Sequence, residues 1–389
     1  MLLIKKPYIK RMDRKSRIYC DIFVDDDCRS VWFEVDKQYE KYLCTERSDA
    51  YLIGLLNWAM REGHDIKCEV PVTEELLYNI NNYLIPTLVS YGESLKSIKI
   101  VSGIAPTIMQ GTEVGTGLSC GVDSFSAICS NSSTSYTEHN ISMLCINNVG
   151  AFNECYSEYG EEKVREERYV LTEKVAQELN LPLVTSDSNF SQVFPQNHLL
   201  SHTYSSCFAI YMLQKLWKIY YYASTGIDYS MFSIISNDTK DAGLYELLSL
   251  QCFSTSGLRI YNDGGTKTRL QKTKEIANYP LVQKYLHVCT TKPYNCSVCP
   301  KCKRTILSLE ALGVLDRFRE VFDVDYFYSH KHEYYIWLYN QHMSGDAMNE
   351  PVYLIFAARK DFIDIINEAF RKPPFIRRIK NKINKVFKN

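Results

Sequence analysis

The sequence lacks the features of several specialised protein classes. Lys plus Arg and Asp plus Glu both number 45 in 389 residues, so no net charge favours nucleic acid or another highly charged partner. No run of about 18 apolar residues predicts a membrane-spanning helix. The N-terminal segment MLLIKKPYIKRMDRKSR has no apolar stretch of the kind found in secretory signals. These absences predict a cytoplasmic protein whose specificity comes from local sites.

The chain also lacks the Gly-Lys-Ser/Thr ending of a Walker-type phosphate loop, which argues against γ-phosphoryl transfer. Cysteine, by contrast, is plentiful. In a long chain without a secretory signal, 14 cysteines indicate reduced thiols and metal ligands rather than disulfides. A hydrophobic fraction of 46% supports well-packed cores, and the length predicts two or three units.

The first predicted unit, residues 1–105, is an α+β domain. Apolar periodicity predicts strands at 17–24, 30–35 and 97–101 and amphipathic helices at 48–63 and 73–92. The run Asp25-Asp26-Asp27 fits a hairpin turn better than a metal site. Nothing in this unit carries recognisable chemistry.

Residues 106–315 form the second predicted unit, in which strands and helices alternate. Strands are expected at 141–148 and 181–187, a charged helix at 161–179, and a buried helix running into a strand at 202–225. This alternation predicts an α/β fold with a parallel sheet. In such sheets ligands bind beyond the C-terminal ends of the strands.

A loop of small residues precedes a predicted helix within residues 117–128, which read GLSCGVDSFSAI. Asp123 and Ser124 stand where the helix would begin. Backbone N–H groups of such a loop, together with the helix N-terminus, can surround a phosphate. The segment therefore predicts an anion site, with an ordinary strand-to-helix turn as the alternative.

Four cysteines lie within 14 residues, at positions Cys289, Cys296, Cys299 and Cys302. Four thiolates at such spacing suit tetrahedral coordination of zinc in a closed structural site. Unlinked buried thiols and an iron–sulfur site are the alternatives. Just before them, residues 266–274 form a basic, hydroxyl-rich helix start containing Lys272, which is either solvated surface or part of a phosphate site.

Together these motifs carry a resemblance. Residues 119–124, SCGVDS, resemble the SGGxDS loop of the N-type ATP pyrophosphatases, and the cysteines extend the similarity to the 7-cyano-7-deazaguanine synthase family over residues 112–313. The resemblance implies a parallel sheet of the adenine nucleotide alpha hydrolase-like type, ATP and Mg²⁺ as cofactors, and a structural Zn²⁺. It also implies attack at the α-phosphate of ATP, with release of pyrophosphate.

The resemblance implies roles for individual residues. ATP would be bound by Ser119, Cys120, Gly121, Val122, Asp123 and Ser124. Asp123, Ser124 and Lys272 would serve catalysis, and Asp241, Tyr245 and Glu246 would face the substrate unless they form a solvated helix start. The chain departs from the family pattern at Cys120, which replaces a glycine, and at Arg304, which lies one position early. Cys120 is a tolerated small residue or, in a thiolating enzyme, a nucleophile.

The expected reaction is ATP-dependent activation of a carboxylate, with amide or nitrile formation or conjugation. A carboxylate is a poor electrophile, whereas its adenylate has AMP as a good leaving group. The expected partners are a small-molecule, peptide or carbohydrate acid and an ammonia or amine donor. A tRNA-modifying or thiolating enzyme, disfavoured by the low basicity, and a non-catalytic nucleotide-binding scaffold are the alternatives.

Residues 316–389 form the third predicted unit, helical and rich in tyrosine. Its aromatic residues predict packing against the N-terminal domain or a second subunit, as in a homodimer. The last 19 residues hold eight basic side chains and no acidic one. They predict a peripheral membrane contact, an RNA contact or a solvated tail.

Overall fold

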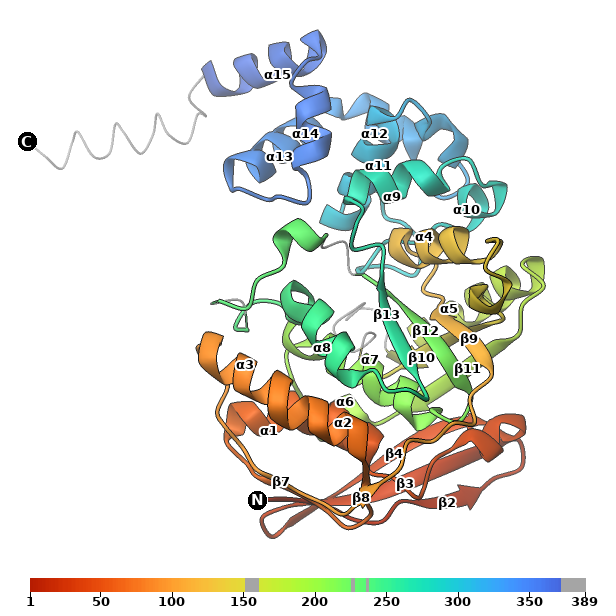
Figure 1. The fold of residues 1–389 in the computed structure, drawn as a ribbon. Coiled ribbons are helices and arrows are strands. Elements are labelled where there is room, and N and C mark those ends of the chain that lie inside the picture. The colour runs from red at the N-terminus through yellow and green to blue at the C-terminus, as the bar shows by residue number, and fades with distance from the viewer. Residues whose placement is uncertain (151–160, 225–227, 236–237, 372–389) are drawn as a thin grey trace, which may run out of the picture.

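The computed structural model describes residues 1–150, 161–224, 228–235 and 238–371. An 11-stranded sheet runs through the molecule (Figure 1). Its strands are β1 (Leu2–Ile4), β2 (Tyr8–Arg11), β3 (Lys15–Val24), β4 (Asp27–Asp36), β5 (Ile66–Cys68), β7 (Ile100–Val101), β9 (Glu113–Gly117), β10 (Met143–Asn148), β11 (Leu183–Ser188), β12 (Trp217–Ala223) and β13 (Arg259–Asp263). A separate pair is formed by β6 (Val72–Thr73) and β8 (Ile104–Ala105).

Five neighbouring strands of the large sheet are parallel and lie in the order β13-β12-β9-β10-β11. If these five strands are numbered 1 to 5 by their order in the chain, their order across the sheet is 5-4-1-2-3, which is the arrangement of a doubly wound sheet. The strand order reverses between β9 and β12, and ligands of such sheets bind at this reversal, beyond the carboxyl ends of the strands. The predicted α/β fold with a parallel sheet is thus present, although β13 was not among the predicted strands.

The sheet does not stop at the boundary predicted after residue 105. Strand β11 pairs with β4 in antiparallel fashion, Ser188 opposite Phe33, and β3, β1, β5 and β7 follow outward. Asn189 reinforces this junction, since its Oδ1 accepts a hydrogen bond of 2.7 Å from the Trp32 backbone N–H. The N-terminal strands and the parallel strands are therefore parts of one continuous sheet.

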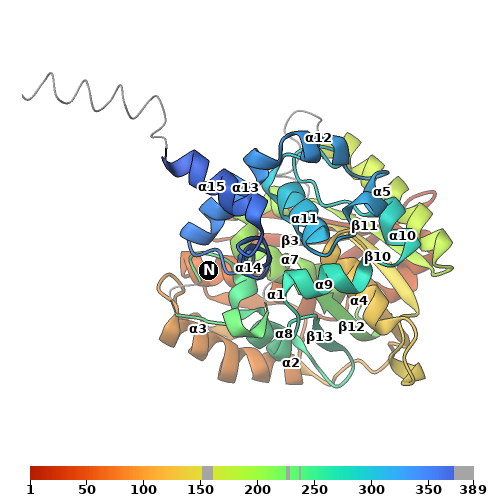
Figure 2. The same ribbon diagram turned by 90° about the horizontal axis from the view of Figure 1, so that it is seen from above.

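Helices cover both faces of the sheet (Figures 1 and 2). They are α1 (Asp49–Glu62), α2 (Glu74–Asn79), α3 (Ile85–Tyr91), α4 (Val122–Asn131), α5 (Glu161–Glu178), α6 (Phe190–Val193), α7 (His198–Met212), α8 (Glu246–Phe253), α9 (Arg269–Ile276), α10 (Pro280–Tyr285), α11 (Pro300–Ala311), α12 (Val324–Ser329), α13 (Lys331–Met343), α14 (Glu350–Phe356) and α15 (Lys360–Arg371). Short helical turns are η1 (Lys37–Tyr42), η2 (Ile80–Leu84), η3 (Thr137–His139), η4 (Tyr229–Met231), η5 (Ala242–Tyr245) and η6 (Leu315–Phe318).

Most N-terminal elements lie where the sequence predicts them. The strands β3 and β4, the helix α1 and the hairpin turn at Asp25, where φ is 52°, match their predictions. The helix predicted over 73–92 is instead divided into α2, the π-helical segment η2 and α3. Pro86 explains the division, because its ring and missing N–H disrupt the regular hydrogen-bond pattern of the preceding turn.

Two hydrophobic cores occupy the two faces of the sheet. In β12, Tyr220 and Tyr222 point into the core formed with α1, α7 and α8, whereas Tyr221 points into the core formed with α4, α9 and α11. This alternation follows from the two-residue repeat of a strand. Side chains of α13 and α14 belong to the second core, so these C-terminal helices share a core with α4, α9 and α11, which cover one face of the parallel strands.

Among the described helices, none is both long and apolar enough to cross a bilayer. Residues 372–389, which hold most of the predicted basic tail, lie outside the described part of the chain. The peripheral membrane contact expected of that tail stays a prediction.

Strand β9 is short of large side chains because Trp217 packs directly on it. A Cβ atom added to Gly115 would lie 2.6 Å from Cζ3 of Trp217, whereas one added to Gly117 would lie 3.5 Å from the Tyr220 hydroxyl. We expect Gly115→Ala to lower the free energy of unfolding by about 1–3 kcal/mol through overpacking. The matched Gly117→Ala should be neutral or slightly stabilising. Urea unfolding measures both, and equal stability of the two variants would contradict this packing.

Candidate functional site

The loop between β9 and α4 closes on itself at the carboxyl end of the central parallel strand. The Ser119 Oγ accepts a hydrogen bond from the Gly121 N–H at 3.3 Å and donates to the Ser124 Oγ at 3.2 Å. The Ser124 Oγ donates to the Gly121 carbonyl at 3.1 Å, and Gly121 is the N-cap of α4. Residues 119–124 therefore lie at a helix N-terminus and at the reversal of strand order, where an anion is best stabilised.

Cys120 occupies a backbone conformation that favours glycine. Its φ is 59°, and its side chain is fully buried in the second core. Burial raises the pKa of the Cys120 thiol to about 12, so the nucleophilic thiolate is scarce at neutral pH. The Cys120 carbonyl accepts a hydrogen bond of 2.8 Å from the His287 N–H. This environment suits a packing residue and argues against a thiol nucleophile.

Two cations from α9 converge on Asp123. The Asp123 Oδ2 lies 2.7 Å from Arg269 and its Oδ1 lies 3.1 Å from the Lys272 Nζ, which also donates to the Ser224 carbonyl at 3.1 Å. Burial raises the pKa of Asp123, but the charges of Arg269 and Lys272 outweigh burial and bring that pKa below its usual value. Lys272 is only 1% exposed, so the alternative of a solvated surface lysine is wrong.

Lys272 reaches Asp123 past a glycine. Gly264 has a φ of +81°, and a Cβ atom there would lie 2.8 Å from Cε of Lys272. A capping box between Thr268 and Gln271 begins α9 and sets the direction of this helix. The buried position of Lys272 is therefore built by the turn before α9 as much as by α9 itself.

Two further arginines add positive charge around the loop, and sequence reasoning did not assign either to the site. Arg168 on α5 donates to the Ser119 carbonyl at 2.9 Å. Arg304 on α11 interacts electrostatically with both Asp123 and Arg269, while it bonds Asn349 at 3.1 Å. Figure 2 shows α9 between α4 and α11 on this side of the molecule. The loop is thus surrounded by cations from three helices, as a site for a polyanion requires.

The three residues predicted to face the substrate lie between β12 and β13 in the chain, and their side chains have different surroundings. The Asp241 Oδ1 accepts hydrogen bonds from the Gly243 N–H at 2.8 Å and shares one of 2.9 Å with the His202 Nε2. Tyr245 is buried in the first core, where burial raises the pKa of its hydroxyl. Glu246 is 2% exposed. The alternative of a solvated helix start is therefore wrong for Tyr245 and Glu246.

Glu246 is a buried carboxyl group that interacts electrostatically with Lys272. Its Oε1 accepts a hydrogen bond of 2.7 Å from the Asn262 Nδ2 at the end of β13. Burial raises the pKa of Glu246 to about 7, although the charges of His202 and Lys272 act in the opposite direction. Near neutral pH this carboxyl group can both take up and release a proton. His202 was not predicted as a site residue.

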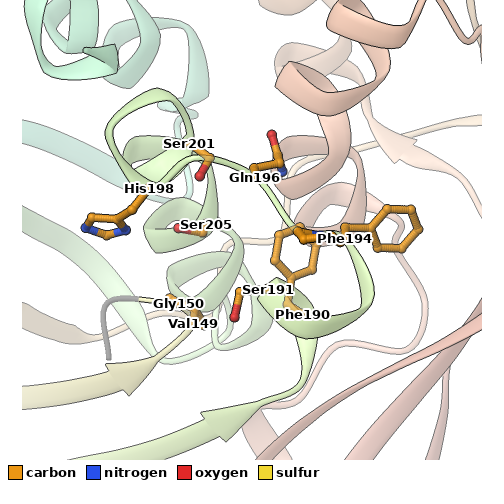
Figure 3. A pocket seen from close by; sticks show the side chains of 10 residues that line it. Val149, Gly150, Phe190, Ser191, Phe194, Gln196, His198, Ser201 and Ser205 are labelled. Carbon is orange, nitrogen blue, oxygen red and sulfur yellow. The ribbon is translucent and has the colours of Figure 1, made fainter. Parts of the chain in front are cut away.

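A cavity of about 150 Å³ opens at the other side of the loop, at the ends of β10 and β11. Figure 3 shows its walls, which come from the end of β10, from α6 and the segment after it, and from the first turns of α7. The lining residues are Val149, Gly150, Phe190, Ser191, Phe194, Pro195, Gln196, His198, Ser201 and Ser205. None of them was predicted, because they are brought together from three separate segments.

The four predicted metal ligands converge in the structure. The Sγ atoms of Cys289, Cys296, Cys299 and Cys302 all lie within 4.8 Å of one another. Two of the separations are 3.9 Å, between Cys289 and Cys299, and 4.0 Å, between Cys296 and Cys302. A tetrahedron with Zn–S bonds of about 2.3 Å separates its sulfur atoms by about 3.8 Å. The four thiols could therefore hold a metal ion such as zinc.

The cysteine cluster connects the loop to the C-terminal helices. Cys289 lies two residues after His287, whose N–H bonds the Cys120 carbonyl. On the other side, the Ser297 carbonyl accepts a hydrogen bond of 2.7 Å from the Tyr334 hydroxyl of α13. A metal ion bound by the four cysteines would therefore hold the loop and helix α13 in fixed positions relative to each other.

We expect purified protein to contain about one zinc ion per chain, measured by elemental analysis. Cys302→Ser should lose the metal and several kcal/mol of stability, because structural zinc contributes about 10 kcal/mol or more of binding free energy to folding. Cys252→Ser, which changes a buried thiol in the other core, is the matched control and should keep its zinc. Full zinc content in Cys302→Ser would contradict the assignment.

The raised pKa of Glu246 leads to a second prediction, which concerns the pH dependence of the protein's stability. Because the folded protein binds this proton more tightly than the unfolded chain, stability should fall as pH rises from about 4.3 towards about 7. The ionised carboxylate then costs at most about 4 kcal/mol at pH 8. Glu246→Gln should remove this part of the pH dependence, which urea unfolding at pH 5 and pH 8 would measure. Identical pH dependence in the wild type and the variant would contradict the burial of an ionisable Glu246.

Searches against protein-family models, curated proteins and solved structures found no match to this chain. The resemblance of the loop and the cysteines to the 7-cyano-7-deazaguanine synthase family stays a hypothesis.

Proposed function

We propose that this chain is an ATP-dependent, AMP-forming enzyme that activates a carboxylate in the manner of the N-type ATP pyrophosphatases. One observation carries the proposal. The loop 119–124 lies at the reversal of strand order of a doubly wound sheet, and it is surrounded by Lys272, Arg269 and Arg168. A triphosphate supplies the negative charge that such a cluster stabilises.

In this proposal the loop and Lys272 bind the phosphates, and Asp123 is a positioning residue. Both Asp123 oxygens already bond cations, which leaves them poorly placed to bind Mg²⁺. Mg²⁺ commonly keeps several water ligands and binds substrate phosphates, so it would enter with ATP and neutralise charge there. Fixed cations at the α-phosphate and at the leaving pyrophosphate lower the barrier to attack by a carboxylate oxygen.

The two sides of the loop suggest where the nucleotide, the acid and the nitrogen donor would bind. The cavity at β10 and β11 has a volume comparable to cavities that bind benzene, and Phe190 and Phe194 line it. We assign a planar ring of the nucleotide to this side. Asp241 and Glu246 lie at the β12 and β13 side, and we assign the acid and its nitrogen donor to that side. Tyr245 receives no ligand contact in this arrangement, because it lies in the core.

A nucleophilic cysteine would favour a thiolating enzyme instead. Among the described cysteines, Cys120 is the one within the proposed phosphate loop, and its burial keeps it as a neutral thiol. The carboxylate-activating function is therefore the one that the site supports best.

The test uses Lys272→Met, which keeps most of the length of the side chain and removes its charge. We expect ATP affinity to fall about 10- to 100-fold, as for the loss of a charged hydrogen-bond partner, measured by calorimetry with Mg²⁺ present. In the wild type, a screen of carboxylic acids with an ammonium salt should release AMP and pyrophosphate. Lys218→Met, at an exposed ion pair with Glu138, is the control and should bind ATP normally. ADP and phosphate as sole products, or unchanged affinity in Lys272→Met, would refute the proposal.

A further inference from the structure

Two buried oxygen atoms beside the proposed active site have no hydrogen-bond partner in the described part of the chain. They are the Oε2 of Glu246 and the Oδ1 of Asn262. The two side chains are bonded to each other through the Glu246 Oε1 and the Asn262 Nδ2, at 2.7 Å, so the two unpaired oxygens belong to one local group. Buried polar atoms are nearly always paired, and an unpaired ionisable carboxylate is especially costly.

No nearby cation of the described chain pairs directly with this carboxylate. The Lys272 Nζ bonds Asp123 and Ser224, and the His202 Nε2 bonds Asp241. Their charges act on Glu246 only at longer range. Within the described chain, the groups that interact electrostatically with Glu246 also include Asp241, Cys207 of α7, Tyr222 of β12 and Tyr229 of η4. A small ligand that is positively charged and rich in N–H donors would satisfy both oxygens.

We propose that Glu246 and Asn262 bind an ammonium ion or a primary ammonium group, which is the nitrogen donor of the reaction. The ammonium group donates one N–H to the Glu246 Oε2 and one to the Asn262 Oδ1. A divalent metal ion fits less well, because Mg²⁺ and Ca²⁺ require six or more oxygen ligands and the pair offers two. The identity of this group as a reactant depends on the proposed function, whereas its binding does not.

The position of Glu246 gives this subsite a chemical role. Its carboxylate takes one proton from the bound ammonium group, which exposes the nitrogen lone pair. A C–N bond then forms to the acyl carbon of the adenylated acid, and the C–O bond to AMP breaks with its electron pair on the phosphate oxygen. A second proton leaves the nitrogen for solvent. Lys272 bonds Asp123 and also interacts electrostatically with Glu246, so the donor and the acyl phosphate would meet near this lysine.

The test measures ligand binding without ATP. Thermal unfolding is followed at pH 8 with ammonium chloride or ethylammonium chloride, and with potassium chloride and tetramethylammonium chloride at equal ionic strength. Ammonium or ethylammonium should raise the midpoint by about 1–2 °C at ten times the dissociation constant. The stronger of the two shows whether the donor is free ammonia or a substituted amine. Below pH 7 the affinity should fall about tenfold per pH unit, because Glu246 becomes protonated.

Glu246→Gln should abolish the shift, whereas Glu310→Gln, at a remote ion pair with Arg359, should keep it. An equal shift with potassium, an unchanged shift in Glu246→Gln, or no ammonium-specific shift in the wild type would each overturn the subsite. The last result would mean that a buried water satisfies the two oxygens. Ammonium binding without any ATP turnover would refute only the proposed function, and pyrophosphate release without ammonium binding would refute only the subsite.

Discussion

The partly buried ion pairs of Asp123 with Lys272 and Arg269 are the constraint on which the rest of the site depends. They tie the first turn of α4 to α9, and they leave cationic side chains at the end of the central strand. Lys272 would carry an uncompensated charge in the protein interior without its carboxylate partner. Lys272 also interacts electrostatically with Glu246, so the same lysine connects the charges of the loop with the acidic group.

The cysteine cluster is a second structural constraint on the loop, and it acts through the segment that contains His287 and Ser297. Through the His287 N–H it holds the Cys120 carbonyl, and through Ser297 it receives the Tyr334 hydroxyl. This explains why α13 and α14 share a core with α4 and α9 although they are distant in sequence. A metal at the cysteines would stabilise a loop that a helix N-terminus alone holds loosely.

Much of the local structure follows from sequence pattern. Strands β3, β4, β10 and β11 and helices α1, α4 and α5 match predicted segments, because their apolar residues repeat with the period of the element. The joining of the N-terminal strands to the parallel sheet did not follow from sequence pattern. Pairing of β11 with β4 depends on contacts over more than a hundred residues, which no local pattern reports.

The sequence by itself determined the sites whose residues are close along the chain. Four cysteines within 14 residues lie close together in space because they are close in the chain. The loop 119–124 likewise includes the start of the helix that follows it. Only the tertiary structure decided the surroundings of the loop. Arg168, Arg304 and His202 reach the site from three helices, and Glu246 became a buried carboxylate because strands and helices from both sides enclose it. Burial and charge are properties of that enclosure, and no short segment of sequence contains them.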